Sequence, residues 1–159
     1  MENHKKFIQR AIEISRQKMN EGAGGPFGCV IVKDNAIIAE GWNQVTSTND
    51  PSAHAEVSAI REACKKLNSF QLTGCTIYTS CYPCPMCLGA IYWARPESVY
   101  FANTAQDAAK IGFDDAFIYE ELQKPFEKFS IPFHQVVAFH KDGLKVFKEW
   151  EQKEDKMRY

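Results

Sequence analysis

The residues best suited to chemistry in this sequence are one histidine, one glutamate and two cysteines in two short stretches. His54 and Glu56 belong to the first stretch, and Cys84 and Cys87 belong to the second. Zinc binds thiolate and imidazole ligands, and a catalytic zinc ion keeps its fourth position for water. One imidazole and two thiolates would therefore hold zinc and leave one position open. Glu56 lies close enough to His54 in the chain to act as the base for that water.

The first stretch is predicted to begin a helix. The turn-forming residues 49–52 precede a helical pattern over residues 54–67, in which apolar side chains recur every three or four positions. His54 and Glu56 therefore fall in the first turn of that helix.

The second stretch is predicted to follow a strand, residues 75–80, and to begin another helix. Proline is tolerated before a helix or in its first turn, so the prolines on either side of Cys84 mark the start of a helix that ends before Pro96. Cys84 and Cys87 then lie on one face of the first turn. Two positive helix N-termini at one metal would favour thiolate ligands.

Other interpretations of the cysteines have weaker support. A redox pair would need a thioredoxin-like context, which the surrounding sequence lacks. Cys81, Cys84 and Cys87 could open an iron–sulfur motif, but Ile91 occupies the position of its fourth cysteine. Cys81 is therefore interpreted as a residue at the end of the strand. A purely structural zinc site is usually closed by four protein ligands, and Glu56 beside an open position argues against one.

Length and composition are those of one soluble domain, residues 1–159. The formal net charge is −1 and the lysines are interleaved with acids, so no basic stripe for nucleic acid is expected. The first residues lack the apolar core of a signal peptide, and no apolar run is long enough to span a bilayer. The six cysteines need no disulfides, so a reducing, cytoplasmic location is predicted.

The remaining pattern predicts a three-layer α/β/α fold with a five-stranded mixed sheet. An amphipathic helix is expected to end at Gly22, and Asp34-Asn35 should join the strands of a hairpin. Further elements are expected as follows: strands over residues 27–32, 36–42, 98–102 and 135–139, and helices over residues 104–110 and from Gly143 onward. On pattern alone, Asn43 is a turn residue and Asp114-Asp115 is a helix N-cap.

Longer stretches of the sequence resemble the cytidine deaminase superfamily, and the resemblance covers nearly all of the chain. The His-x-Glu and Pro-Cys-x-x-Cys pattern is the signature shared by zinc-dependent nucleobase deaminases. Within the superfamily, the chain is most similar to bacterial guanine deaminases, in residues 24–28, 49–56, 79–94 and 112–115 and in its terminal Tyr159. One departure is Tyr82, where Glu commonly precedes the Pro-Cys pair.

The resemblance implies hydrolytic deamination of guanine to xanthine and ammonia, in purine catabolism or salvage. It assigns His54, Cys84 and Cys87 to one zinc ion per chain. It assigns proton transfer to Glu56. Asp115 would assist proton transfer to the leaving amine and recognise guanine.

The resemblance also implies a purine pocket and a homodimer. Asn43 and the backbone of Ala55 would bind the purine edge, and Phe27 and Trp93 would flank the ring. Tyr159 would arrive from the partner subunit of a domain-swapped dimer and close the pocket.

Two other activities remain open on the sequence. A tRNA-specific adenosine deaminase would share the fold and the zinc site, but it would need a basic groove for structured RNA. A deaminase of another small aminated heterocycle, such as cytosine, a pterin or an azapurine, would need no such groove.

Overall fold

The computed structural model describes residues 2–159, and the side chains of residues 4–159. Packing within the chain divides it into two compact units, with the boundary between Ala116 and Phe117. In chain order, the elements of the first unit are α1 (Glu2–Asn20), β1 (Gly28–Lys33), β2 (Ala36–Trp42), α2 (Val45–Thr48), α3 (Ala55–Leu67), β3 (Cys75–Cys81), α4 (Pro85–Ala94), β4 (Ser98–Asn103) and α5 (Ala105–Lys110). Helix α6 (Ala116–Leu122) begins at the boundary, and the second unit continues with the 3-10 helices η1 (Phe126–Lys128) and η2 (Val137–Phe139) and with α7 (His140–Gln152).

The four strands of the first unit form one mixed sheet in the order β2-β1-β3-β4. Strand β1 pairs antiparallel with both β2 and β3, and β3 pairs parallel with β4. The turn between β1 and β2 has positive φ at both Asp34 (48°) and Asn35 (61°). This conformation matches the right-handed twist of a hairpin, and the predicted hairpin is confirmed.

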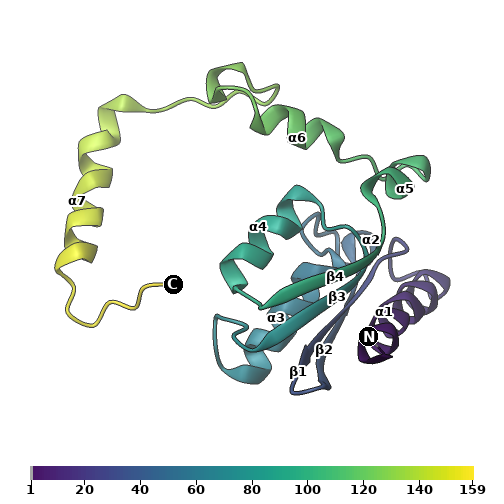
Figure 1. The fold of residues 1–159 in the computed structure, drawn as a ribbon. Helices are drawn as coiled ribbons and strands as arrows, with labels where there is room; N and C mark the ends of the chain where they lie inside the picture. Colours follow the sequence, from purple (N-terminus) through teal and green to yellow (C-terminus); the bar gives the residue numbers. More distant parts are fainter. Residues whose placement is uncertain (1) are drawn as a thin grey trace. The chain divides into compact units, whose positions relative to one another are not determined.

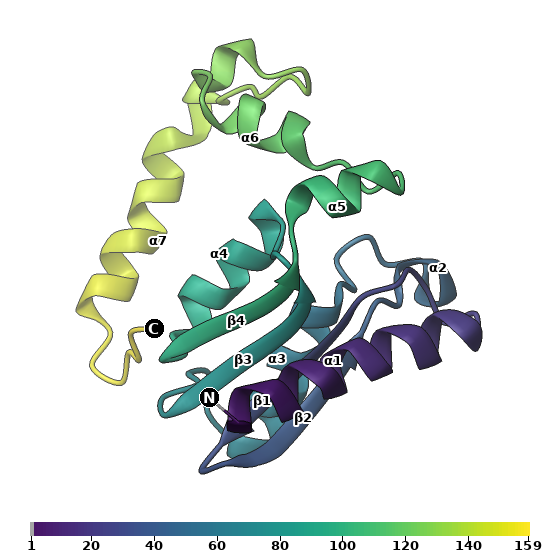
Figure 2. The same cartoon turned by 45° about the vertical axis from the view of Figure 1, so that its right-hand side comes forward.

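Helices cover both faces of this sheet. Figures 1 and 2 show α1 on one face and α3 and α4 on the other. Successive residues of β1 serve the two faces in turn, because strand side chains alternate. Val30 and Val32 pack in a cluster with Phe7 of α1, whereas Cys29 and Ile31 belong to the cluster that contains the buried alanines of α3. The predicted three-layer arrangement is confirmed.

A glycine in β2 lets α3 lie directly on the strand. A Cβ atom built on Gly41 would overlap the carbonyl oxygen of Ala55, the first residue of α3, and would lie 2.9 Å from the Cβ of Ala59. Because His54 immediately precedes α3, this close approach fixes the height of a predicted metal ligand above the sheet.

The prediction of a fifth strand is wrong. The structure has η2 at the end of residues 135–139, and the sheet has four strands. A strand needs a partner for its backbone hydrogen bonds, and residues 117–159 contain no other strand. The closing helix also begins earlier than predicted, because α7 starts at His140 and Gly143 lies inside it.

The second unit buries none of its side chains. All of residues 117–159 are exposed or only half-buried. The exposed fraction is 72% for Phe147, 71% for Val137 and 70% for Tyr159. A short segment with this much exposed apolar surface lacks a core of its own. Among the described residues, no helix combines the length and the apolar composition needed to cross a membrane.

Candidate metal centre

Three potential metal ligands meet where two helices begin. His54 is the N-cap residue of α3, Cys84 is the N-cap residue of α4, and Cys87 lies in the first turn of α4. Their ligand atoms lie within 4.8 Å of one another. Both Sγ atoms are 3.5 Å from Nδ1 of His54, so Nδ1 is the imidazole nitrogen that faces the thiols. The predicted grouping of these three side chains is confirmed.

The donor set of this cluster fits zinc. An imidazole and two thiols are ligands that zinc prefers, and a site with three protein ligands keeps a position for water. Cys81 lies outside the cluster: it ends β3, and its Sγ donates to the carbonyl oxygen of Thr104 at 3.4 Å. Its interpretation as a strand-end residue is therefore confirmed.

The two cysteines of the cluster differ in acidity. The neighbouring Cys87 side chain and the His54 imidazole stabilise the Cys84 thiolate and lower the pKa of Cys84 to about 4. The neighbouring Cys84 side chain and burial raise the pKa of Cys87. The lowered pKa favours the thiolate form of Cys84, which is the form that binds zinc.

Glu56 is buried beside the cluster, with 6% of its surface exposed. The hydroxyl of Thr79 donates to its Oε1 at 2.7 Å, and the thiol of Cys87 donates to its Oε2 at 3.3 Å. Burial raises the pKa of Glu56, and the hydrogen bond from Thr79 opposes that rise. A carboxyl group with a raised pKa is suited to accept and return a proton near neutral pH.

The structure separates the two adjacent aspartates. Asp114 Oδ1 accepts a hydrogen bond of 2.9 Å from the backbone N–H of Ala116, the first residue of α6, and so forms an Asx turn that leads into the helix. Asp115 makes a different set of interactions. Burial raises its pKa, and its carboxyl group also interacts electrostatically with Cys84 and His54. Asp114 therefore has a local backbone role at the start of α6, and Asp115 is left within electrostatic range of the metal ligands.

Asn43 is more than a turn residue. Its side chain is buried, and its Oδ1 accepts hydrogen bonds from the backbone N–H groups of Gly25 at 3.1 Å and Val45 at 3.3 Å. A Cβ atom at Gly24 would lie 2.6 Å from the same oxygen, so the glycine loop packs tightly against this side chain. These contacts fix the orientation of the amide and leave its NH₂ group as the donor that Asn43 can offer.

The other predicted binding residues differ in their exposure. Ala55 is fully buried and begins α3, and Phe27 is half-buried. Trp93 lies on α4 with 64% of its surface exposed. Tyr159 belongs to the second unit, whereas the metal ligands belong to the first.

Two residues that were not predicted as site residues contact them. Thr79 is the residue whose hydroxyl donates to Glu56. Phe113 packs edge-to-face on Phe27, with 4.9 Å between the ring centroids. The available signal for Thr79 was its position in β3, two residues after the buried Ile77 and therefore on the same face of the sheet.

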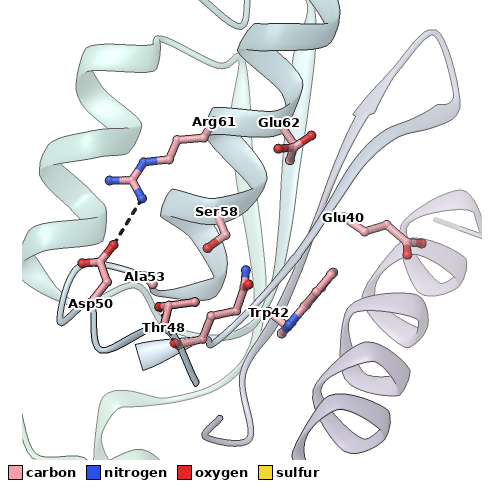
Figure 3. Close-up of a pocket in the computed structure, with 9 residues that line it drawn as sticks. Glu40, Trp42, Thr48, Asp50, Ala53, Ser58, Arg61 and Glu62 are labelled. Atoms are coloured by element: carbon pink, nitrogen blue, oxygen red, sulfur yellow. Dashed lines mark hydrogen bonds and ion pairs between the residues drawn. The ribbon is translucent and has the colours of Figure 1, made fainter. Parts of the chain in front are cut away.

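A separate surface pocket of about 350 Å³ lies between β2, the segment around α2 and α3 (Figure 3). Arg61 and Asp50 form an ion pair of 3.7 Å across its edge. Gln44 and Ala53, joined by a backbone hydrogen bond of 2.9 Å, contribute to its wall. None of the three metal ligands lines this pocket. Two of its lining residues, Gln44 and Ala53, are adjacent in sequence to Asn43 and His54. The full lining is Glu40, Trp42, Gln44, Thr48, Asp50, Ala53, Ser58, Arg61 and Glu62.

Comparison with known families identifies the metal. Residues 1–103 match the family described as the cytidine and deoxycytidylate deaminase zinc-binding region. His54, Cys84 and Cys87 all lie within the matched range, and they form the zinc-binding site. The four-stranded mixed sheet with helices on both faces is accordingly a cytidine deaminase-like fold.

The chain is similar to individual proteins over different fractions of its length. It is 56% identical to guanine deaminase from Bacillus subtilis (strain 168) over 157 residues, which are 99% of each chain. An X-ray structure of the Bacillus subtilis enzyme matches 98% of each chain with a TM-score of 0.95. A structure of guanine deaminase from Nitrosomonas europaea matches 69% of this chain and 63% of its own, with 31% identity and a TM-score of 0.66.

A second class of relative covers less of the chain. A tRNA-specific adenosine deaminase from Aquifex aeolicus (strain VF5) is 40% identical over 96 residues, which are 60% of this chain and 63% of the relative. The similarity to the Bacillus subtilis protein therefore includes a large part of the chain that the similarity to the Aquifex aeolicus protein does not.

Proposed function

Because the chain belongs to the zinc-binding family of cytidine and deoxycytidylate deaminases, we propose that it deaminates guanine hydrolytically to xanthine and ammonia, in purine catabolism or salvage. The observation that carries this proposal is the extent of similarity. The Bacillus subtilis guanine deaminase matches 99% of the chain, whereas the Aquifex aeolicus tRNA-specific adenosine deaminase matches 60%. The formal net charge of −1 also favours a small neutral substrate over structured RNA.

The reaction needs a proton carrier beside the metal. His54, Cys84 and Cys87 would hold zinc, which would supply a Lewis acid that lowers the pKa of water toward ~7. Glu56 accepts a proton as oxygen adds to C2 of guanine, and it returns a proton so that the exocyclic amine can leave as ammonia. Its burial and its raised pKa suit it to both steps. One water is consumed, the C2–N bond breaks and a C2–O bond forms.

Other residues hold the base and assist the departure of ammonia. The fixed NH₂ group of Asn43 donates to an acceptor on the purine edge, and the N–H of Ala55 at the start of α3 binds the same edge. Phe27 and Trp93 flank the ring. Asp115, whose pKa is raised by burial, shares proton transfer to the leaving amine and recognises guanine by accepting from its N–H groups.

The direct test is ammonia release by zinc-loaded protein from a panel of free bases, nucleosides and RNA. The panel contains guanine, adenine, cytosine, an azapurine, a pterin, guanosine and a tRNA anticodon stem-loop. We expect the highest kcat/KM for guanine and no release from the stem-loop at low or moderate salt. A higher kcat/KM for the stem-loop adenosine would replace this proposal with the tRNA-editing activity.

We also propose that the protein acts as a homodimer in which residues 117–159 of one copy cover the zinc site of the other. The domain would then be the whole chain, residues 1–159, completed by exchange of its C-terminal segment. Support comes from the absence of buried side chains in residues 117–159 and from the exposed aromatic side chains of α4, Tyr92 (79%) and Trp93 (64%). Tyr159 would close the pocket and exclude both water and a base attached to RNA.

Subunit mixing tests the exchange. Chains that lack Met157–Tyr159 and chains with Glu56→Ala should each have little activity alone. In an exchanged hybrid dimer, one site combines an intact Glu56 with a donated tail. Random exchange should then restore about a quarter of the sites of the parent. Demonstrated hybrid dimers without recovered activity would exclude the exchange.

The six free cysteines and the absence of a membrane-spanning helix among the described residues are compatible with a cytoplasmic enzyme, which we propose as its location. No membrane partner and no nucleic-acid partner are part of the proposal. The implied ligands are one zinc ion per chain and a small purine.

A further inference from the structure

We propose that Thr79 is a positioning residue for the proton carrier: its hydroxyl holds the Glu56 carboxylate in the orientation that directs the other carboxylate oxygen toward the metal. The inference rests on the proposed function only in giving Glu56 the role of proton carrier. Thr79 acts through Glu56, and not on the substrate or the metal.

The geometry of β3 places this hydroxyl under the metal site. Cys75, Ile77 and Thr79 are every second residue of β3, so their side chains lie on the same face of the sheet. Cys75 and Ile77 belong to the apolar cluster on the α3 and α4 side. Thr79 has an exposed fraction of 0%. Its Oγ1 lies 2.7 Å from Oε1 of Glu56. A threonine at this position is therefore a polar group in an apolar layer, and its hydroxyl is satisfied by the carboxylate.

Zinc binding makes this contact more important. The thiol of Cys87 donates to Oε2 of Glu56 at 3.3 Å. A cysteine that ligates zinc is a thiolate, which has no proton to donate. In the zinc-loaded protein, Oε2 would therefore no longer accept a hydrogen bond from Cys87. Oε1 keeps the hydrogen bond from Thr79, so the carboxylate remains held at one oxygen while the other is free to exchange protons.

Few other groups are able to hold the carboxylate. Among the residues that the structure describes, the donors that act on Glu56 are Thr79, Cys87 and its own backbone N–H. The backbone group belongs to the same residue and restrains the side chain only from its base. With Cys87 on zinc, Thr79 is the remaining donor from another residue, because the carboxylate is buried away from bulk water.

The test compares variants that differ by one polar group. Thr79→Val replaces the hydroxyl with a methyl group of similar volume, and Thr79→Ser keeps the hydroxyl. Thr76→Val is the matched control, because Thr76 lies on the same strand but on the opposite face of the sheet. Its hydroxyl oxygen accepts a hydrogen bond from the Ser98 hydroxyl. All variants are purified with zinc and measured for metal content, thermal unfolding, kcat and KM for guanine. Crystal structures of zinc-loaded parent and Thr79→Val give the orientation of Glu56.

We expect Thr79→Val to bind one zinc ion per chain and to lower kcat by ~10²-fold, because misplacing a catalytic group by about 1 Å has effects of this size. KM should change by less than about threefold, since the lost contact acts on the chemical step. Thr79→Ser should recover most of the kcat, and Thr76→Val should resemble the parent. In crystals of Thr79→Val, the Glu56 carboxylate should be rotated or disordered. Should Thr79→Val not fold, Thr79→Cys supplies a weak S–H donor of intermediate effect.

Two results would overturn the inference. One is an unchanged Glu56 orientation in zinc-loaded Thr79→Val. The other is an equal loss of kcat in Thr79→Val and Thr79→Ser, because that pattern indicates packing and not the hydroxyl. The crystallographic result does not depend on the substrate. If the parent protein fails to deaminate guanine, the proposed function is wrong, while the orientation of Glu56 still decides the role of Thr79.

Discussion

The two units of this protein differ in whether they bury their apolar side chains. Residues up to Ala116 bury apolar side chains on both faces of a sheet, and they hold the zinc ligands and Glu56 on that rigid support. Residues 117–159 bury no side chain and contain no strand. The first unit therefore contains what is needed to bind zinc. The second unit leaves its apolar side chains exposed, and under the proposed exchange we expect it to affect substrate use and not metal binding.

The largest effect should come from a zinc ligand in the first unit. Cys84→Ser should abolish both zinc binding and activity, because the variant lacks the cysteine with the lowered pKa. Metal analysis by mass spectrometry of purified protein measures the loss. Cys81→Ser is the matched control and should keep one zinc ion per chain. Stoichiometric iron with a visible absorption band in the parent would contradict the zinc assignment.

Removal of the proton carrier should have the next largest effect. Glu56→Gln should keep the fold and the zinc ion, and it should lower kcat by ~10²–10⁴-fold, which is the usual contribution of a general acid–base group. Steady-state kinetics with guanine measure the change. Glu62→Gln, on the same helix but in the wall of the separate pocket, serves as the control. Turnover of Glu56→Gln within a few-fold of the parent would remove Glu56 from the mechanism.

Substitutions of the two adjacent aspartates at the end of the first unit should have different effects on guanine turnover. Asp115→Asn should lower guanine turnover by about 10-fold or more, as expected for a group that assists proton transfer. Asp114→Asn should be nearly silent, since an Asn side-chain oxygen can accept the same hydrogen bond from Ala116 in an Asx turn. The kcat values of the two variants, measured together with their melting temperatures, decide the matter. Equal losses in both would indicate that the pair acts only through the start of α6.

Changes in the second unit should separate substrate use from stability. Deletion of Met157–Tyr159 should leave zinc content and melting temperature close to those of the parent, while raising KM or lowering kcat for guanine. The comparison of metal analysis, thermal unfolding and kinetics on one preparation tests this. A loss of zinc in the truncated chain would show that the proposed division of roles between the units is wrong.

The smallest effect should come from a glycine inside α7. A Cβ atom added at Gly143 would meet only open space, so Gly143→Ala should add ~0.5–1 kcal/mol of helix stability. Thermal unfolding should show a melting temperature raised by about 1–4 °C for a chain of this size. A lowered melting temperature together with weaker dimers would show instead that this face of α7 is covered by the second copy.

The local part of the zinc site could be predicted from the sequence. His54, Cys84 and Cys87 sit at helix starts, and helix starts have sequence signals that extend over only a few residues. Elements whose partners lie far away in the chain were harder to predict. Residues 135–139 have the apolar composition of a strand, but composition does not reveal whether a pairing strand exists.

Roles that depend on side-chain geometry were also beyond the sequence. Asp114 and Asp115 are the same amino acid in adjacent positions, and residue type alone does not distinguish them. The family resemblance assigned a role to Asp115, and the structure separates the pair by the hydrogen bond of Asp114 to Ala116 and by the burial of Asp115. Thr79 occurs in a strand among buried residues, where a threonine commonly serves packing. Its contact with Glu56 joins residues that are far apart in the chain, and no pattern within β3 indicates that contact.

The glycine under α3 has a consequence for how this protein can vary. Every other amino acid carries a Cβ atom, and at position 41 that atom would overlap the first residue of α3. Any missense mutation at this codon must therefore lift the helix that follows His54 away from β2. Such a mutation would change the metal site without altering any ligand. In a saturation library selected for cell growth that requires the activity of this zinc protein, only glycine should be recovered at position 41. This position should tolerate as little substitution as a metal-ligand position.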